Sequence, residues 1–207
     1  MSSIAELQAR YSRPAQFAPI QIMVPVDLRK IFQSRSLRNF SLYALPRVEA
    51  GQFWMPVGEL ARLIGRQLKH QISQERLAGM MAASVTLQHS PLVQRIPLAI
   101  KEPALRIGHR FLGDGSSCLS LSNLGEAALP EELRPLVARM EFMLSPRKIS
   151  PYNCGMISYG GRLYITFSRR GGVPELEKIF FQQLTAAGCP AMVEVDARLV
   201  DSDTAWA

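Results

Sequence analysis

Two short polar segments follow apolar stretches of the chain, and their side chains are suited to binding chemistry. The first is Asp27-Leu28-Arg29, which comes directly after the apolar run 20–26. A guanidinium there can hold carboxylates or backbone carbonyls through its planar fork of N–H groups. The second is Ser122-Asn123-Leu124-Gly125. A strand that ends in this pattern leaves backbone N–H groups and short polar side chains that can hold a developing oxyanion.

Each segment also has a purely structural interpretation. Arg29 can serve as an internal brace, with Asn39 as a turn residue in the following loop. The segment 122–125 can be an Asx turn, in which the asparagine side chain bonds the backbone two residues on. The residues alone leave both interpretations open.

The elements that must position these segments mix strand and helix patterns. Apolar, β-rich runs predict strands over 20–26, 39–45, 118–122, 137–144, 154–159, 163–168 and 191–195. Helical spacing or capping predicts helices over 3–11, 28–33, 57–89 with a break near 72–74, 91–111 and 173–187. Gly160 and Gly161 predict a primed hairpin turn. This order predicts an α/β fold with a mixed sheet flanked by helices.

The chain shows no composition shift that requires a further division. We expect an N-terminal helix and linker over 1–19, one lobe over 20–196, and a frayed tail over 197–207.

Three motifs in this order resemble the C-terminal half of acyltransferases with the chloramphenicol-acetyltransferase-like fold. They are Pro25-Val26-Asp27-Leu28-Arg29 with Asn39-Phe40 behind it, Ser122-Asn123-Leu124-Gly125, and the hairpin Ser158-Tyr159-Gly160-Gly161-Arg162-Leu163 with Val173-Pro174 after it. The superfamily includes alcohol O-acetyltransferases, wax-ester synthases and peptide-synthetase condensation domains. The chain lacks the DFGWG motif of plant and condensation-type relatives, and it is most similar to bacterial alcohol O-acetyltransferase-like or wax-ester synthase-like proteins.

The resemblance implies a half of a two-lobed enzyme. A complete relative would transfer an acyl group from coenzyme A or a carrier thioester to an alcohol. The resemblance places six residues at the cleft between the lobes: Arg29, Asn39, Ser122, Asn123, Gly125 and Tyr159. It implies acyl-CoA as a cosubstrate and no tightly bound cofactor.

The catalytic motif of the superfamily, HHxxxDG, normally precedes the first of these segments, and no histidine precedes it here. His70 and His89 fall at expected helix ends, where surface positions are typical. His109 begins a segment that matches the motif except that Arg110 replaces the second histidine, and arginine cannot accept a proton. We therefore expect the chain to be inactive alone and to need an HHxxxDG lobe in trans or to self-associate. The alternatives are a non-catalytic binding or assembly module of the same fold and, with less support, a basic nucleic-acid-binding domain.

Composition narrows these choices. The formal charge is +7, but the cations are scattered and no nucleic-acid-binding motif accompanies them, so we expect no nucleic-acid partner. The three cysteines have no zinc-ligand spacing and are expected to be buried free thiols. No run of about 18 apolar residues predicts a membrane span, and the polar N-terminus does not resemble a secretory leader. A cytoplasmic location is expected.

Overall fold

A computed structural model describes residues 1–13, 16–89, 118–146, 152–171 and 174–195. The chain divides into two compact units, Met1–Ala18 with Gly171–Ala207, and Pro19–Arg170. The expected lobe over 20–196 therefore extends past the second unit. The expected helix over 91–111, His109 and the expected tail over 197–207 lie outside the described residues.

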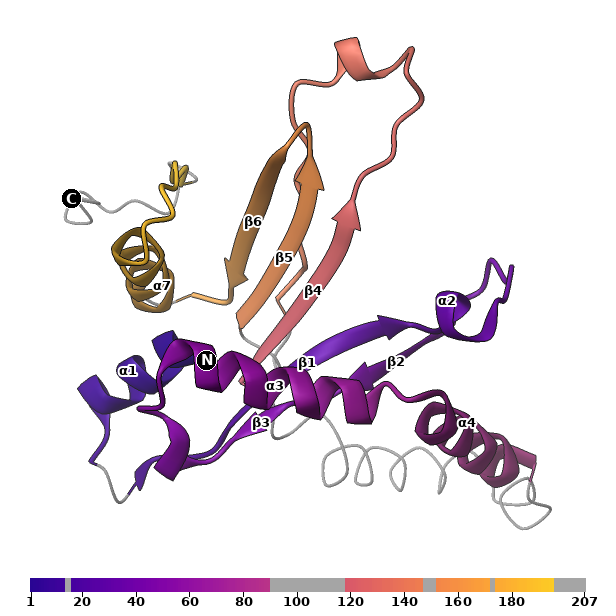
Figure 1. The fold of residues 1–207 in the computed structure, drawn as a ribbon, viewed down its shortest axis with the longest axis horizontal. Helices are drawn as coiled ribbons and strands as arrows, with labels where there is room; N and C mark the ends of the chain where they lie inside the picture. The colour runs from indigo at the N-terminus through magenta and orange to yellow at the C-terminus, as the bar shows by residue number, and fades with distance from the viewer. Residues whose placement is uncertain (14–15, 90–117, 147–151, 172–173, 196–207) are drawn as a thin grey trace. The chain divides into compact units, whose positions relative to one another are not determined.

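The second unit is built on a six-stranded sheet with the order β2-β1-β4-β5-β6, in which β3 also pairs with β1 (Figure 1). Pairing is parallel between β1 and β4 and between β4 and β5, and antiparallel elsewhere. The predicted α/β fold with a mixed sheet and flanking helices is confirmed. The strands are β1 Ile20–Asp27, β2 Ser41–Ala44, β3 Arg47–Val48, β4 Leu119–Glu126, β5 Tyr152–Tyr159 and β6 Arg162–Arg169.

One edge of this sheet is a single interrupted strand. β2 and β3 keep the same register on β1, because Val24 pairs with Ala44 and Ile20 with Val48. Pro46 separates them because it has no N–H for a ladder bond. Its carbonyl still accepts a bond from the Ile22 N–H at 3.1 Å. The sequence did not predict β3, since two residues are too few to show a strand pattern.

Helix α3, Val57–Gln71, bonds to this edge through two glutamine side chains. The Gln71 amide bonds both the N–H and the C=O of Leu45, and the Gln67 amide does the same at Arg47. Residues four apart on a helix rise about 6 Å, and residues two apart on a strand about 6.6 Å. The two amides therefore match alternate strand residues and replace a neighbouring strand.

In the described part of this unit, the two other α-helices lie where the sequence predicts them. Asp27 caps the short α2, Leu28–Phe32, by accepting the Arg29 N–H on its side chain. The predicted break near 72–74 separates α3 from α4, Gln74–His89. Buried apolar side chains from β1, α2, β3, α3, α4 and β4 form the core of this unit, among them Ile20, Leu28, Val48, Leu60, Leu77 and Leu119.

The β5–β6 hairpin turns at Gly160 and Gly161, whose φ angles are 59° and 73°. The predicted primed turn is confirmed. One face of the hairpin contacts the irregular segment 137–146, and the Thr166 and Ser168 hydroxyls donate to the carbonyls of Phe142 and Leu144. The strand predicted over 137–144 is therefore wrong. Its alternating pattern is real, but these carbonyls bond to side chains and form no strand ladder.

The first unit pairs two helices, α1 Ser2–Tyr11 and α7 Glu175–Ala186. Ser3 donates to Gln183 at 2.9 Å, and Gln183 donates to Glu6 at 2.8 Å. Tyr11 donates to Glu175, and this bond raises the pKa of the tyrosine. The strand predicted over 191–195 is wrong, because these residues are exposed and form no strand in the described part of the chain.

Candidate functional site

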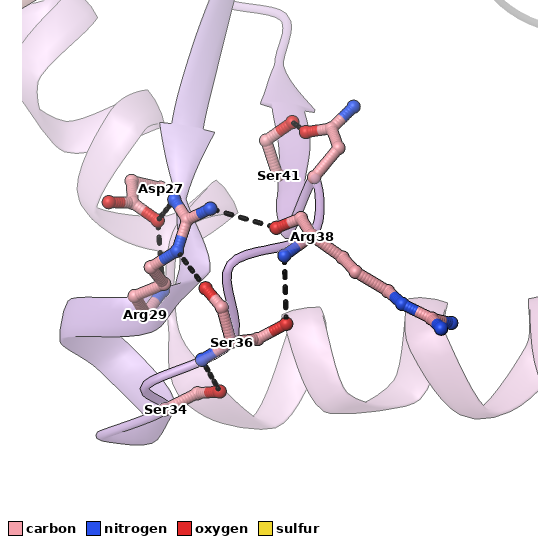
Figure 2. A network of polar contacts seen from close by, with 7 residues as sticks. Asp27, Arg29, Ser34, Ser36, Arg38 and Ser41 are labelled. Atoms are coloured by element: carbon pink, nitrogen blue, oxygen red, sulfur yellow. Dashed lines mark hydrogen bonds and ion pairs between the residues drawn. The ribbon is translucent and has the colours of Figure 1, made fainter.

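Arg29 lies at the end of β1 and braces the loop that leads to β2. Its Nε donates to the Ser36 carbonyl at 2.7 Å, and an Nη donates to the Arg38 carbonyl at 2.8 Å (Figure 2). The other Nη lies 3.2 Å from the Asp27 carboxylate. The guanidinium therefore binds one carboxylate and two backbone carbonyls, all within residues 27–38 at the end of β1 and in its loop.

Short hydroxyl side chains complete the same loop. The Ser36 N–H donates to Ser34 Oγ and the Arg38 N–H to Ser36 Oγ, both at 3.2 Å. Asn39 accepts a bond from the Ser41 hydroxyl at 2.8 Å and is exposed. The fork of Arg29 and these side chains hold the loop in one conformation. Asn39 helps to shape the turn before β2 in this arrangement.

The second candidate segment lies at the end of β4. The Gly125 N–H donates to the Asn123 side-chain oxygen at 2.8 Å, which is an Asx turn. Gly125 has a φ of 75°, a conformation that other residues rarely adopt. Ser122 pairs with Gly155 in the ladder between β4 and β5. A ligand oxyanion could reach the Gly125 N–H only if Asn123 rotated away.

Tyr159 ends β5 beside this segment, since Glu126 pairs with Ser158. Its hydroxyl lies 3.0 Å from the Val137 carbonyl and 3.3 Å from that of Arg134. The side chain therefore helps to hold the connection between β4 and β5. In this structure the hydroxyl is therefore hydrogen-bonded to backbone carbonyls of the chain itself.

The sheet brings the two segments to the same end. β1 and β4 are adjacent and parallel, with Ile22 opposite Leu119 and Met23 opposite Ser120. Both strands run on from these pairs to their carboxyl ends, where the candidate residues lie. Ligands of open α/β sheets bind at such ends. No hydrogen bond or ion pair within the described residues joins Arg29 or Asn39 to the group formed by Ser122, Asn123, Gly125 and Tyr159.

The nucleophiles and bases of the described chain are poorly placed for catalysis here. Burial raises the pKa of the Cys154 thiol to about 11, so it stays protonated at neutral pH. Cys118 is half-buried and Cys189 is exposed, so the expectation of three buried thiols is wrong. Helix α7 ends at Ala186, and Cys189 lies among the exposed residues that follow it. His70 and His89 are exposed at the ends of α3 and α4.

Several residues that shape this region were not identified from the sequence. The serines at 34 and 36 are a signal for ST turns, because short hydroxyls before backbone N–H groups favour them. Gly155 interrupts a β-rich run, which is a signal for close backbone approach. The carbonyl of Phe142 lies directly over it. Gln67 and Gln71 carry no local signal for their strand partners.

Neither a scan against protein-family models nor a search of curated proteins finds a match to this chain. Within the described residues, no cluster of three or more histidine, cysteine, aspartate or glutamate side chains could hold a metal ion. No helix of the described part is both long and apolar enough to cross a membrane.

Proposed function

We propose that this chain is the C-terminal lobe of an acyl-CoA-dependent O-acyltransferase similar to alcohol acetyltransferases, inactive without a lobe that carries the HHxxxDG motif. The observation that carries the proposal is the placement of two motif segments. The residues around Arg29 and those around Asn123 follow two adjacent parallel strands and emerge at the same end of the sheet. A cleft between lobes would need both at one surface.

The side chains present indicate which steps of the reaction this lobe could support and which need the other lobe. General-base catalysis of alcohol attack on a thioester needs an imidazole beside the acceptor hydroxyl. The described histidines lie at the ends of α3 and α4, outside both candidate segments. This lobe would therefore supply binding and shape. The backbone N–H of Gly125 would be exposed by rotation of Asn123, and Arg29 would keep the neighbouring loop in place.

The test is complementation by a separate lobe. The DNA directly upstream is searched for an open reading frame that encodes HHxxxDG, and its product is mixed with this chain. Thiol release from acetyl-CoA in the presence of an alcohol is then followed. Release should require both polypeptides and should vanish when both motif histidines are replaced by alanine. No gain over this chain alone would contradict the proposal.

Two variants test whether the reaction takes place at the proposed surface. Asn123→Ala frees the Gly125 N–H but removes the Asx turn, and it should change the rate of the mixed lobes by about tenfold or more. Asn39→Ala removes one exposed hydrogen bond and should change it less. Unchanged rates in both variants would move the site elsewhere.

A second candidate function is a non-catalytic assembly module of the same fold. One face of β4–β6 favours it, because its apolar side chains are incompletely buried. Leu121, Met156 and Ile165 are half-buried there, and Leu163 is 56% exposed. Such a face favours association with another surface. Light scattering should then give an oligomer mass that falls for Leu163→Ser. A monomer at all concentrations would reject this candidate.

A further inference from the structure

The loop between α2 and β2 presents one apolar side chain fully to water. Leu37 is 100% exposed. Its neighbours Arg35 and Arg38 are also exposed, as is Lys30 on the short helix that precedes the loop. An exposed leucine is ordinary by itself. This leucine differs because it lies at the tip of a loop held by hydrogen bonds, between Arg35 and Arg38.

Hydrogen bonds from Arg29 and from two serines of the loop hold the tip residues 36–38 in place. The Arg29 fork binds the carbonyls on both sides of Leu37, those of Ser36 and Arg38. The two serine hydroxyls accept the N–H groups of Ser36 and Arg38. The polar backbone atoms beside the tip are therefore satisfied inside the loop, and the side chains of the tip point outward. Figure 2 shows the Arg38 side chain extending away from the network.

The tip cations have no acidic partner within the described residues. The carboxylate of this network belongs to Asp27, and it is paired with Arg29. No salt bridge of the described chain includes Lys30, Arg35 or Arg38. The chain as a whole carries a formal charge of +7. The loop thus combines rigid presentation, one apolar anchor and uncompensated positive charge.

We propose that this loop docks on an anionic lipid surface, with Leu37 entering the acyl boundary and the arginines contacting headgroup phosphates. A protein partner is less well suited, because protein interfaces have a contiguous apolar or aromatic centre, and the neighbours of Leu37 are Arg, Ser and Asn. A fluid bilayer can close around a single apolar side chain. Bracing by Arg29 lowers the ordering cost of binding. This inference does not depend on the acyltransferase proposal.

The experiment measures flotation of the full chain with vesicles of phosphatidylcholine containing 30% phosphatidylserine, and with phosphatidylcholine alone, at low and high salt. The wild-type chain should bind the anionic vesicles and be released by salt. Arg35→Gln with Arg38→Gln should weaken binding about 25-fold, roughly fivefold per cation. Leu37→Ser should weaken it about tenfold or more. Leu37→Trp should retain or strengthen it, since tryptophan favours the membrane interface.

Matched controls separate the loop from general charge and general hydrophobicity. Arg62→Gln with Arg66→Gln removes the same charge from exposed positions of α3, and Leu136→Ser removes a leucine that is 79% exposed elsewhere. Both should bind within about twofold of the wild type. Equal loss in the α3 variant, full binding by Leu37→Ser, or no wild-type binding to anionic vesicles would each overturn the proposal. So would binding to duplex DNA without binding to vesicles, which would indicate a nucleic-acid partner.

Discussion

The β2–β3 edge and the β5–β6 hairpin solve the same problem with different side chains. At the edge, amides of α3 satisfy the backbone of the strand. At the hairpin, hydroxyls on β6 satisfy the backbone of an irregular segment. An amide carries a donor and an acceptor, so one glutamine can serve both backbone groups of a residue. A hydroxyl has one O–H to donate, and that of Thr166 is shared between the carbonyls of Phe142 and Gly155. The backbone groups of the edge are therefore bonded as a neighbouring strand would bond them. The hairpin face is instead covered by a closely packed segment that leaves no space for a larger side chain at Gly155.

This contrast predicts that the hairpin face is the less tolerant of added volume. A Cβ built on Gly155 would overlap the Phe142 carbonyl and lie 2.9 Å from Thr166 Oγ1. Gly155→Ala should lower the free energy of unfolding by about 3 kcal/mol, because the segment must shift. Denaturant unfolding measures the change. Gly65→Ala on α3 is the control, since its Cβ meets nothing within 4 Å. It should stabilise by up to about 1 kcal/mol. A loss below 1 kcal/mol for Gly155→Ala would remove the contrast.

The glutamine contacts should act as a pair. Gln67→Ala with Gln71→Ala leaves the N–H and C=O groups of Leu45 and Arg47 without these partners. We expect a loss of about 2–3 kcal/mol in the free energy of unfolding. The opened edge should also increase self-association, visible by light scattering. Gln182→Ala, an exposed glutamine on α7, should change neither quantity. If the double variant matches this control, the amides contribute nothing to the edge.

The sequence predicts elements well where the pattern is local. The Asp27 cap, the break between α3 and α4 and the turn at Gly160 and Gly161 each depend on a few adjacent residues. Segments 137–144 and 191–195 were predicted as strands because alternation and β-rich composition do not reveal whether a neighbouring strand exists. Hydroxyls on β6 take the carbonyls of the first segment, and that pairing joins residues 24 positions apart.

The candidate site divides in the same way. The turn at Asn123 and Gly125 follows from local Asx chemistry, which the sequence offered as one of two interpretations. The hydrogen bond from the Tyr159 hydroxyl to the Val137 carbonyl depends on the path of the irregular segment 137–146. Local composition cannot give that path.

Cys154 lies on the face of β5 opposite to Gly155, and its thiol allows a test by pH. Burial raises the pKa of Cys154 to about 11 from 9.0. The folded state binds this proton more tightly than the unfolded state, so the contribution is full below pH 9 and is lost as pH rises to 11. The decline attributable to this thiol is about 2 kcal/mol. Cys154→Ala should unfold with a smaller decline over this range, whereas Cys189→Ala, an exposed thiol, should keep the wild-type decline. Parallel curves for wild type and Cys154→Ala would show that this face is open to water.

The smallest expected effects come from the hydroxyls of the hairpin. Thr166→Val keeps the shape of the side chain but leaves the Phe142 carbonyl without its donor, and Ser168→Ala does the same at Leu144. Each should cost about 1 kcal/mol in the free energy of unfolding. Ser158→Ala is the control, because its ladder position opposite Leu163 places it on the other face, and it should be near neutral. Both hydroxyls hold one segment, so the double variant should lose less than the sum of the single variants. Full additivity would mean that the two carbonyls are held independently, and that the segment is a series of separate contacts and not a single covering unit.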